Sequence, residues 1–331
     1  MWRQPRATRP LARRGNPPMR PFRFMAEAGA IVSGDELAAT ARRAEAMGYS
    51  VLLLTDHLIE QLAPIPAMTA IAGATSRLRV GTFVLNNELR HPAVLAQDLA
   101  TIDVLSGGRL EVGIGAGWNK PEFDHLGLAF EPVPARVARL VEAVAILKGC
   151  FGDGPFSYRG EHYRITDYDA QPKPVQQPHP PLLIGGGGRR TLELAAREAD
   201  IVGLAPRVLA GERTDPRSIT FAAAAEKIDW VRAAAGDRFD RLEFNVYPSS
   251  SPIIITDHAR AEAAKIRDRL LARTGYELTE DEILGSPHVF IGSVDGLVAK
   301  FQDLRERLGI SSFMTGRIDE LAPIVERLVG T

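Results

Sequence analysis

Short apolar segments alternate with segments of helical periodicity along most of this chain, and that alternation limits the folds it can adopt. Strands that are apolar along their whole length are typical of a parallel sheet covered by helices, because both faces of such a sheet are buried. The strands predicted in this way are residues 22–25, 51–54, 79–85, 110–114, 182–184, 201–204, 242–246 and 310–314.

Eight strand and helix units in about 310 residues fit a (β/α)8 TIM barrel of the α/β class. A doubly wound sheet is the alternative, but that fold normally carries its glycine fingerprint in the first turn. Here the glycine-rich turn follows the fifth strand. The helices predicted between the strands are residues 35–47, 68–75, 93–105, 135–149, 192–198, 222–235 and 321–328.

Two stretches interrupt the alternation and are interpreted as insertions. Residues 151–181, after the fourth helix, combine glycines and tyrosines with a proline-rich run and predict a small hairpin with an extended return. Residues 248–290, between the seventh and eighth strands, include a charged helix at 259–271. The Arg- and Pro-rich residues 1–20 predict a disordered tail, and residues 21–331 predict a single barrel domain. Translation starting at Met19 instead of Met1 stays open.

Composition narrows the class of function. The chain has 40 Lys and Arg against 41 Asp and Glu, so it offers no charge footprint for nucleic acid or an anionic membrane. No apolar run approaches the ~20 residues that span a bilayer. The single cysteine, Cys150, lies in an apolar helical pattern and excludes an internal disulfide. These features predict a cytoplasmic protein with no nucleic-acid or membrane partner.

The run Gly185, Gly186, Gly187 and Gly188 links a predicted strand to a predicted helix. Glycines let backbone N–H groups approach a ligand closely, and the positive end of the helix favours an anion, so a phosphate site is predicted here. The spacing matches neither a dinucleotide fingerprint nor a Walker loop. Thr191 would add a hydroxyl, and a merely flexible connection is the alternative.

Polar and aromatic residues follow the other strands at the edge where a barrel binds its ligands. Asp56 and His57 follow the second strand, Asn86 the third, and Gly117 and Trp118 the fourth. Each has a structural alternative: Asp56 as a cap, His57 and Trp118 as core residues, and Asn86 as a turn residue. Their convergence on one rim favours a ligand site with an acid, an imidazole and an indole wall.

Other chemistries find little support. The histidines have no metal-ligand spacing, so no metal is predicted, and no serine nucleophile motif is present. Glu122 and Asp124, taken as strand residues two apart, are not favoured as a glycosidase pair. A phosphate-binding lyase would more typically place a lysine at a strand end, and the predicted strand ends carry none.

These motifs together resemble the bacterial luciferase-like monooxygenase superfamily, and within it the branch of oxidoreductases that use the deazaflavin coenzyme F420. The resemblance covers residues 21–206 well. The segments that carry it are residues 44–49, 55–57, 80–82, 90–97, 105–109, 113–118 and 180–188.

The resemblance implies roles for these residues. Asp56 and His57 would be the catalytic acid and imidazole beside the flavin ring, with His57 exchanging a proton. It also implies a non-proline cis peptide near Phe83-Val84, pressed against the ring. The implied cofactor-binding residues are Asp56, His57, Phe83, Val84, Asn86, Ala116, Gly117, Trp118, Gly185, Gly186, Gly187, Gly188 and Thr191.

The implied activity is hydride transfer between C5 of F420 and an unidentified small organic substrate. An FMN-dependent monooxygenase and a non-catalytic flavin-binding barrel are the alternatives. Trp118 stands where some relatives carry a catalytic carboxylate, which argues against a sugar-phosphate dehydrogenase. A homodimer is expected from the resemblance alone.

Overall fold

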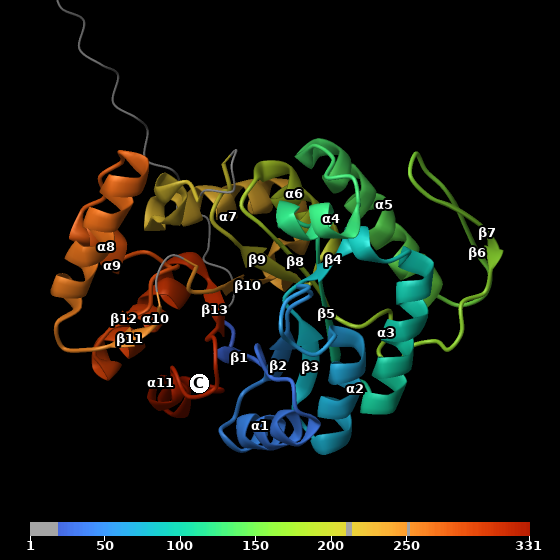
Figure 1. The fold of residues 1–331 in the computed structure, drawn as a ribbon, viewed down its shortest axis with the longest axis horizontal. Coiled ribbons are helices and arrows are strands. Elements are labelled where there is room, and N and C mark those ends of the chain that lie inside the picture. The colour runs from blue at the N-terminus through green and yellow to red at the C-terminus, as the bar shows by residue number, and fades with distance from the viewer. Residues whose placement is uncertain (1–18, 210–213, 250–251) are drawn as a thin grey trace, which may run out of the picture.

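The chain folds as a closed parallel barrel ringed by helices, which confirms the predicted TIM barrel (Figure 1). The computed structural model describes residues 19–209, 214–249 and 252–331, so most of the predicted disordered tail lies outside the described residues. The strands follow the order β3-β2-β1-β13-β10-β9-β8-β5-β4, and pairing of β3 with β5 closes the sheet. They are β1 (Arg23–Glu27), β2 (Val51–Leu54), β3 (Arg79–Thr82), β4 (Leu85–Asn86), β5 (Leu110–Gly115), β8 (Leu182–Gly186), β9 (Ile201–Leu204), β10 (Glu243–Val246) and β13 (Ile310–Met314).

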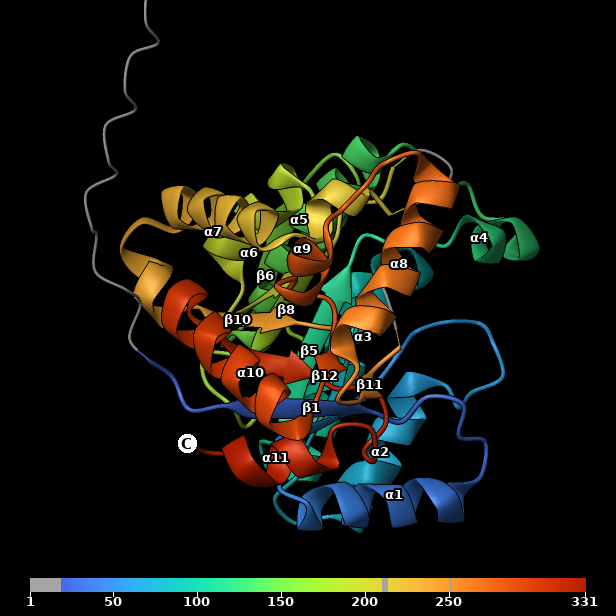
Figure 2. The same cartoon turned by 90° about the vertical axis from the view of Figure 1, so that its left-hand side faces the viewer.

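Helices follow most of these strands and cover the outside of the barrel (Figures 1 and 2). None of the helices in the described ranges is long and apolar enough to cross a bilayer. They are α1 (Gly34–Ala46), α2 (Pro64–Ala74), α3 (Pro92–Ser106), α4 (Lys120–Leu126), α5 (Val133–Phe151), α6 (Arg189–Glu198), α7 (Phe221–Ala235), α8 (Ala259–Thr274), α9 (Glu280–Leu284), α10 (Val294–Leu308) and α11 (Ala322–Leu328).

The apolar strands are buried on both faces. In β2, Val51 and Leu53 belong to a cluster that also contains Met25 of β1 and Met314 of β13. Leu52, between them in sequence, belongs instead to the large core that the strands share with the helices. Successive side chains of a strand point to opposite faces, so the first cluster fills the barrel and the second lies outside it. This explains why the strands show no alternation of polar and apolar residues.

The third predicted strand, residues 79–85, is interrupted in the structure. β3 ends at Thr82, the Phe83-Val84 peptide bond is cis, and β4 then resumes pairing with β5. β3 and β4 both pair with β5 and together occupy one position in the barrel. The nine strands of the sheet therefore form an eight-stranded barrel. The cis peptide at Phe83-Val84 is therefore confirmed, whereas the unbroken strand is not.

The hairpin predicted in residues 151–181 and the helix predicted at 259–271 are both present. β6 (Phe156–Arg159) and β7 (Arg164–Tyr168) form an antiparallel hairpin. The second stretch, residues 248–290, contains α8 and then α9. Its short strand β11 (Ile254–Ile255) pairs with β12 (Ile291–Gly292).

Three helices, α4, α9 and α10, were not predicted, although their end signals are in the sequence. α10 begins after Ser293, whose side chain accepts from the Gly296 amide, and it ends at the left-handed Gly309. α4 has a proline in its first turn and ends at the left-handed Gly127. α4 stands off from the helical ring in Figure 2, beyond the strands of the barrel.

A cluster of ion pairs lies at the base of the barrel, where the strands begin. Arg23, the first residue of β1, lies 2.9 Å from a carboxylate oxygen of Glu243 and 2.5 Å from Glu111. Arg79 Nε lies 2.6 Å from the same oxygen of Glu111. The two carboxylates are nearly buried, so their charges depend on these arginines.

Replacing Arg23 by Met should lower the free energy of unfolding by about 3 kcal/mol, because buried carboxylates then lose a partner. Arg43→Ala is the control, since Arg43 and its partner Asp319 are both largely exposed, and it should change stability by less than about 0.5 kcal/mol. Denaturant unfolding of both variants measures this. Equal stability of Arg23→Met and wild type would refute the structural importance of the cluster.

Candidate functional site

The predicted site residues come from consecutive barrel strands. β2 pairs with β3, β3 with β5, and β5 with β8, all in parallel. The carboxyl ends of these strands therefore meet at one rim. Asp56 and His57 follow β2, Asn86 ends β4, Gly117 and Trp118 follow β5, and the glycine run ends β8. The structure thus brings the predicted residues to one side of the barrel.

His57 lies at this rim between a carboxylate and an indole. Its Nδ1 is 2.9 Å from Oε1 of Glu122, and its ring meets Trp118 edge to face with centroids 5.6 Å apart. The Trp118 residue is 54% exposed, so it is a wall of the rim and not a core residue. An imidazole and a flat apolar surface therefore lie side by side.

Glu122 is a residue that the sequence interpretation had set aside. It was taken as a strand residue, but the structure places it in helix α4, where its side chain is only 7% exposed. Asp124 is exposed on the same helix and pairs with Lys120 at 2.6 Å. Pro121 and Gly127 mark the ends of α4 in sequence, and they were the signal that would have placed Glu122 correctly.

Asp56 is not the partner of His57. Its two carboxylate oxygens accept from Arg90 at 2.5 and 2.9 Å, and Oδ2 also accepts from the backbone N–H of Asn86 at 2.9 Å. The side chain is almost fully buried. Asp56 thus links the end of β2 to β4 through Arg90 and Asn86, while Glu122 supplies the carboxylate at His57.

The loop that carries His57 is fixed by Gln61. The Nε2 group of Gln61 donates to the carbonyls of Thr55 and His57, both at 2.9 Å. The Thr55 hydroxyl donates in return to Oε1 of Gln61 at 2.8 Å. Both ends of the amide are engaged, so the backbone that positions the imidazole is held before any ligand binds.

Glu27, the last residue of β1, is a second carboxyl at the rim that was not predicted. Burial raises its pKa, and the charge of His57 acts in the opposite direction. Its position at a strand end is the same signal that identified Asp56 and Asn86.

The backbone after β5 is held in a conformation that requires glycine. Gly117 has φ +73°, and a Cβ there would lie 2.5 Å from Oδ1 of Asn86. That oxygen accepts from the amide of Glu88 at 3.1 Å. The Arg136 guanidinium donates to the carbonyls of Ala116 and Gly117.

Phe83 and Val84, on either side of the cis peptide, pack against the cluster that fills the barrel. The Phe83 ring meets Tyr247 edge to face at 5.3 Å. These two residues therefore give the rim an apolar floor beneath the polar groups.

Steric packing requires glycine at only some positions of the run Gly185–Gly188. A Cβ on Gly186 would lie 2.7 Å from Cγ2 of Thr191, and one on Gly187 would clash with the Pro206 carbonyl. A Cβ on Gly188 would meet nothing within 4 Å, and Gly185 allows ordinary contacts. Gly188 is also the N-cap of α6, and a glycine has no side chain to accept from the first amides of that helix.

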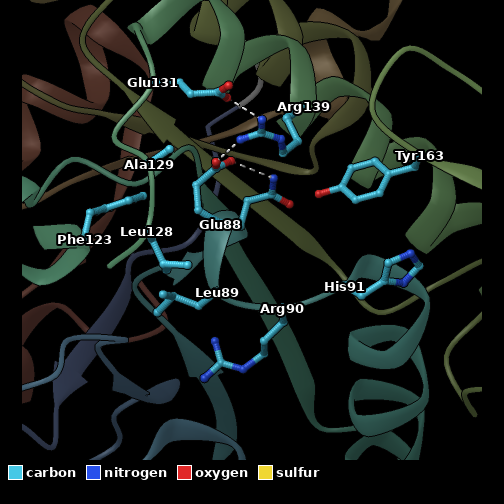
Figure 3. A pocket seen from close by; sticks show the side chains of 11 residues that line it. Glu88, Leu89, Arg90, His91, Phe123, Leu128, Ala129, Glu131, Arg139 and Tyr163 are labelled. Carbon is cyan, nitrogen blue, oxygen red and sulfur yellow. Dashed lines mark hydrogen bonds and ion pairs between the residues drawn. The ribbon is translucent and has the colours of Figure 1, made fainter. Parts of the chain in front are cut away.

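A pocket of about 410 Å³ is lined by residues 87–91 before α3, by α4 and α5, and by Tyr163 of the hairpin turn (Figure 3). Arg139 forms ion pairs with Glu88 and Glu131 in its wall, and Tyr163 faces it from the hairpin (Figure 3). Arg90, which holds Asp56, also lines it. Within the described ranges, no three His, Cys, Asp or Glu side chains gather closely enough to hold a metal ion.

Comparison with known proteins identifies two kinds of relative. The chain is 38% identical over 131 residues to an FMNH(2)-dependent dimethylsulfone monooxygenase of Pseudomonas putida, covering 40% of this chain and 36% of that protein. It is 34% identical over 165 residues to an F420-dependent glucose-6-phosphate dehydrogenase of Microbacterium testaceum, covering 47% and 48%. The chain thus matches about a third to a half of the length of these curated relatives.

Among solved structures, the fold resembles the coenzyme F420-dependent tetrahydromethanopterin reductase of Methanopyrus kandleri. The TM-score is 0.73 at 21% identity, and the match covers 94% of this chain and 99% of that one. The family model described as luciferase-like monooxygenase matches residues 19–288, and the chain therefore belongs to the luciferase-like monooxygenase family.

Proposed function

We propose that this chain is an oxidoreductase that transfers a hydride between C5 of coenzyme F420 and a small organic substrate, with His57 exchanging the accompanying proton. The observation that carries the proposal is the His57 imidazole held between Glu122 and Trp118 at the carboxyl ends of the strands. Two curated relatives named F420-dependent glucose-6-phosphate dehydrogenase support the choice of cofactor.

The residues at the rim fit a deazaflavin with a phosphate-bearing tail. Gly188 leaves open space at the uncapped start of α6, which suits a phosphate. Phe83 and Val84 offer an apolar surface for the ring system. We propose that the backbone of Ala116 and Gly117 contacts the ring or its side chain, and that the remaining contacts come from Asn86, Trp118, Gly185, Gly186, Gly187 and Thr191.

When bound, the cofactor supplies a hydride acceptor or donor. The chain supplies a group that takes or gives a proton, since imidazoles titrate near neutral pH. Trp118 shields one side of that ring and forms a wall for an organic substrate. Glu27 adds a carboxyl near the same ring.

Asp56 has a different part in this proposal. Both of its oxygens are engaged by Arg90 and the Asn86 amide, so we propose that Asp56 positions the end of β4 against β2 and does not transfer protons. The expected homodimer and cytoplasmic location stay predictions.

One observation favours a second candidate, an FMN-dependent monooxygenase. The Pseudomonas putida relative, named for FMNH(2), is 38% identical over the matched 131 residues. A phosphate at α6 and a ring over Phe83 would suit FMN as well, so the cofactor must be tested directly.

Fluorescence titration of the purified protein with F420 and with FMN separates these candidates. We expect F420 to bind more tightly. Tighter binding of FMN would overturn the choice of cofactor and favour the monooxygenase.

Replacing His57 by Ala should lower turnover about 10²- to 10³-fold, because proton exchange in the transition state loses its side chain. The dissociation constant of the cofactor should change less than threefold in the same titration. His125→Ala, which alters an exposed histidine of α4, is the matched control. Cofactor-linked turnover over a substrate panel provides the measurement, and normal turnover of His57→Ala would disprove proton exchange by this residue.

Replacing Gly188 by Ala tests the phosphate site without a clash in the protein itself. The added methyl should weaken cofactor binding about tenfold, while thermal unfolding stays unchanged. Gly73→Ala, at another glycine whose Cβ meets nothing within 4 Å, should leave the affinity unchanged. Wild-type affinity of Gly188→Ala would place the phosphate elsewhere.

A further inference from the structure

We propose that Glu122 is a positioning residue that fixes His57 in the tautomer with hydrogen on Nδ1, leaving Nε2 as the proton acceptor. The catalytic consequence rests on the proposed function, in which His57 exchanges the proton. The tautomer itself does not depend on that function. The carboxylate that completes the site therefore comes from α4 and not from the neighbouring Asp56.

The direction of the hydrogen bond follows from a shared oxygen. Oε1 of Glu122 lies 3.1 Å from the backbone nitrogen of Leu58 and 2.9 Å from Nδ1 of His57. A backbone N–H only donates, so Oε1 acts as an acceptor. An ionised carboxylate has no hydrogen to give, and Nδ1 must therefore carry the hydrogen in the pair. The neutral ring is then left with an unprotonated Nε2.

Glu122 is held rigidly enough to have this effect. The neighbouring Phe123 is buried, and its ring meets Phe130 edge to face at 4.9 Å. The Arg136 guanidinium stacks on Phe130 at 4.1 Å and donates to the Gly117 carbonyl. Helix α4 is thus tied to the same loop that carries Trp118. Because Gln61 fixes the other partner, both sides of the hydrogen bond are preorganised.

The charges around His57 reinforce the arrangement. Glu122 faces the ring from α4, and Glu27 interacts with it from β1. Trp118, its neighbour after β5, carries no charge. When His57 takes up a proton, the resulting imidazolium already has a carboxylate 2.9 Å from Nδ1. Orientation and charge stabilisation thus come from one side chain, as in other carboxylate–imidazole pairs.

Two variants of Glu122 distinguish the effect of its hydrogen-bond acceptor from the effect of its negative charge. Glu122→Gln keeps a carbonyl oxygen for Leu58 and His57 but removes the charge, whereas Glu122→Leu removes both. Asp124→Asn, on the exposed side of the same short helix, is the matched control and should behave as wild type.

Nitrogen-15 NMR of the histidine-labelled full chain, without cofactor, reads the tautomer directly, with His57→Gln assigning the signal. Above neutral pH, wild type and Glu122→Gln should show His57 with hydrogen on Nδ1, and Glu122→Leu should show a mixture with the Nε2 form. A wild-type ring with hydrogen on Nε2, or an unchanged tautomer in folded Glu122→Leu, would overturn the proposal. If Glu122→Leu does not fold, wild type and Glu122→Gln still decide it.

Turnover then tests the catalytic consequence. Relative to wild type, kcat should fall about 10-fold in Glu122→Gln and about 100-fold in Glu122→Leu, with KM and cofactor affinity changed less than threefold. Equal kcat in all three proteins would contradict a positioning role in catalysis. Failure of the proposed function would appear separately, as absence of F420-linked turnover in wild type with the tautomer unchanged.

Discussion

The pairing of β3 with β5 closes the barrel, and the arrangement of the site depends on that closure. Because the strands around it are parallel, four consecutive strand ends meet at one rim. Residues far apart in sequence, such as His57 and Trp118, are then neighbours. Where β3 gives way to β4 at the cis Phe83-Val84 bond, the rim gains its apolar floor.

Three buried carboxylates lie at the base and at the rim of the barrel, and they do not all have the same kind of partner. Glu111 joins the strand beginnings at the base through Arg23 and Arg79. At the rim, both oxygens of Asp56 accept hydrogen bonds from Arg90. Glu122 has an imidazole as its partner instead of an arginine. This is the pair to which we assign the proposed proton exchange.

The barrel was predictable because continuous apolar strands are a strong pattern, and the rim followed from the rule that ligands bind at strand ends. The partners at the rim were not predictable in the same way. His57 is bound by Glu122, which lies 65 residues further along the chain. Adjacency in sequence suggested Asp56, but the oxygens of Asp56 are bound by Arg90 and by the Asn86 amide. The glycine run was recognised, yet only the packing around each Cβ shows that Gly188 is the open position.

A structure with the deazaflavin bound tests the central claim most directly. The account predicts the cofactor phosphate at the start of α6 beside Gly188, with the ring over Phe83 and Val84 and Nε2 of His57 facing the substrate side of C5. A cofactor bound away from this rim, or an imidazole whose Nε2 is turned from the ring, would contradict it.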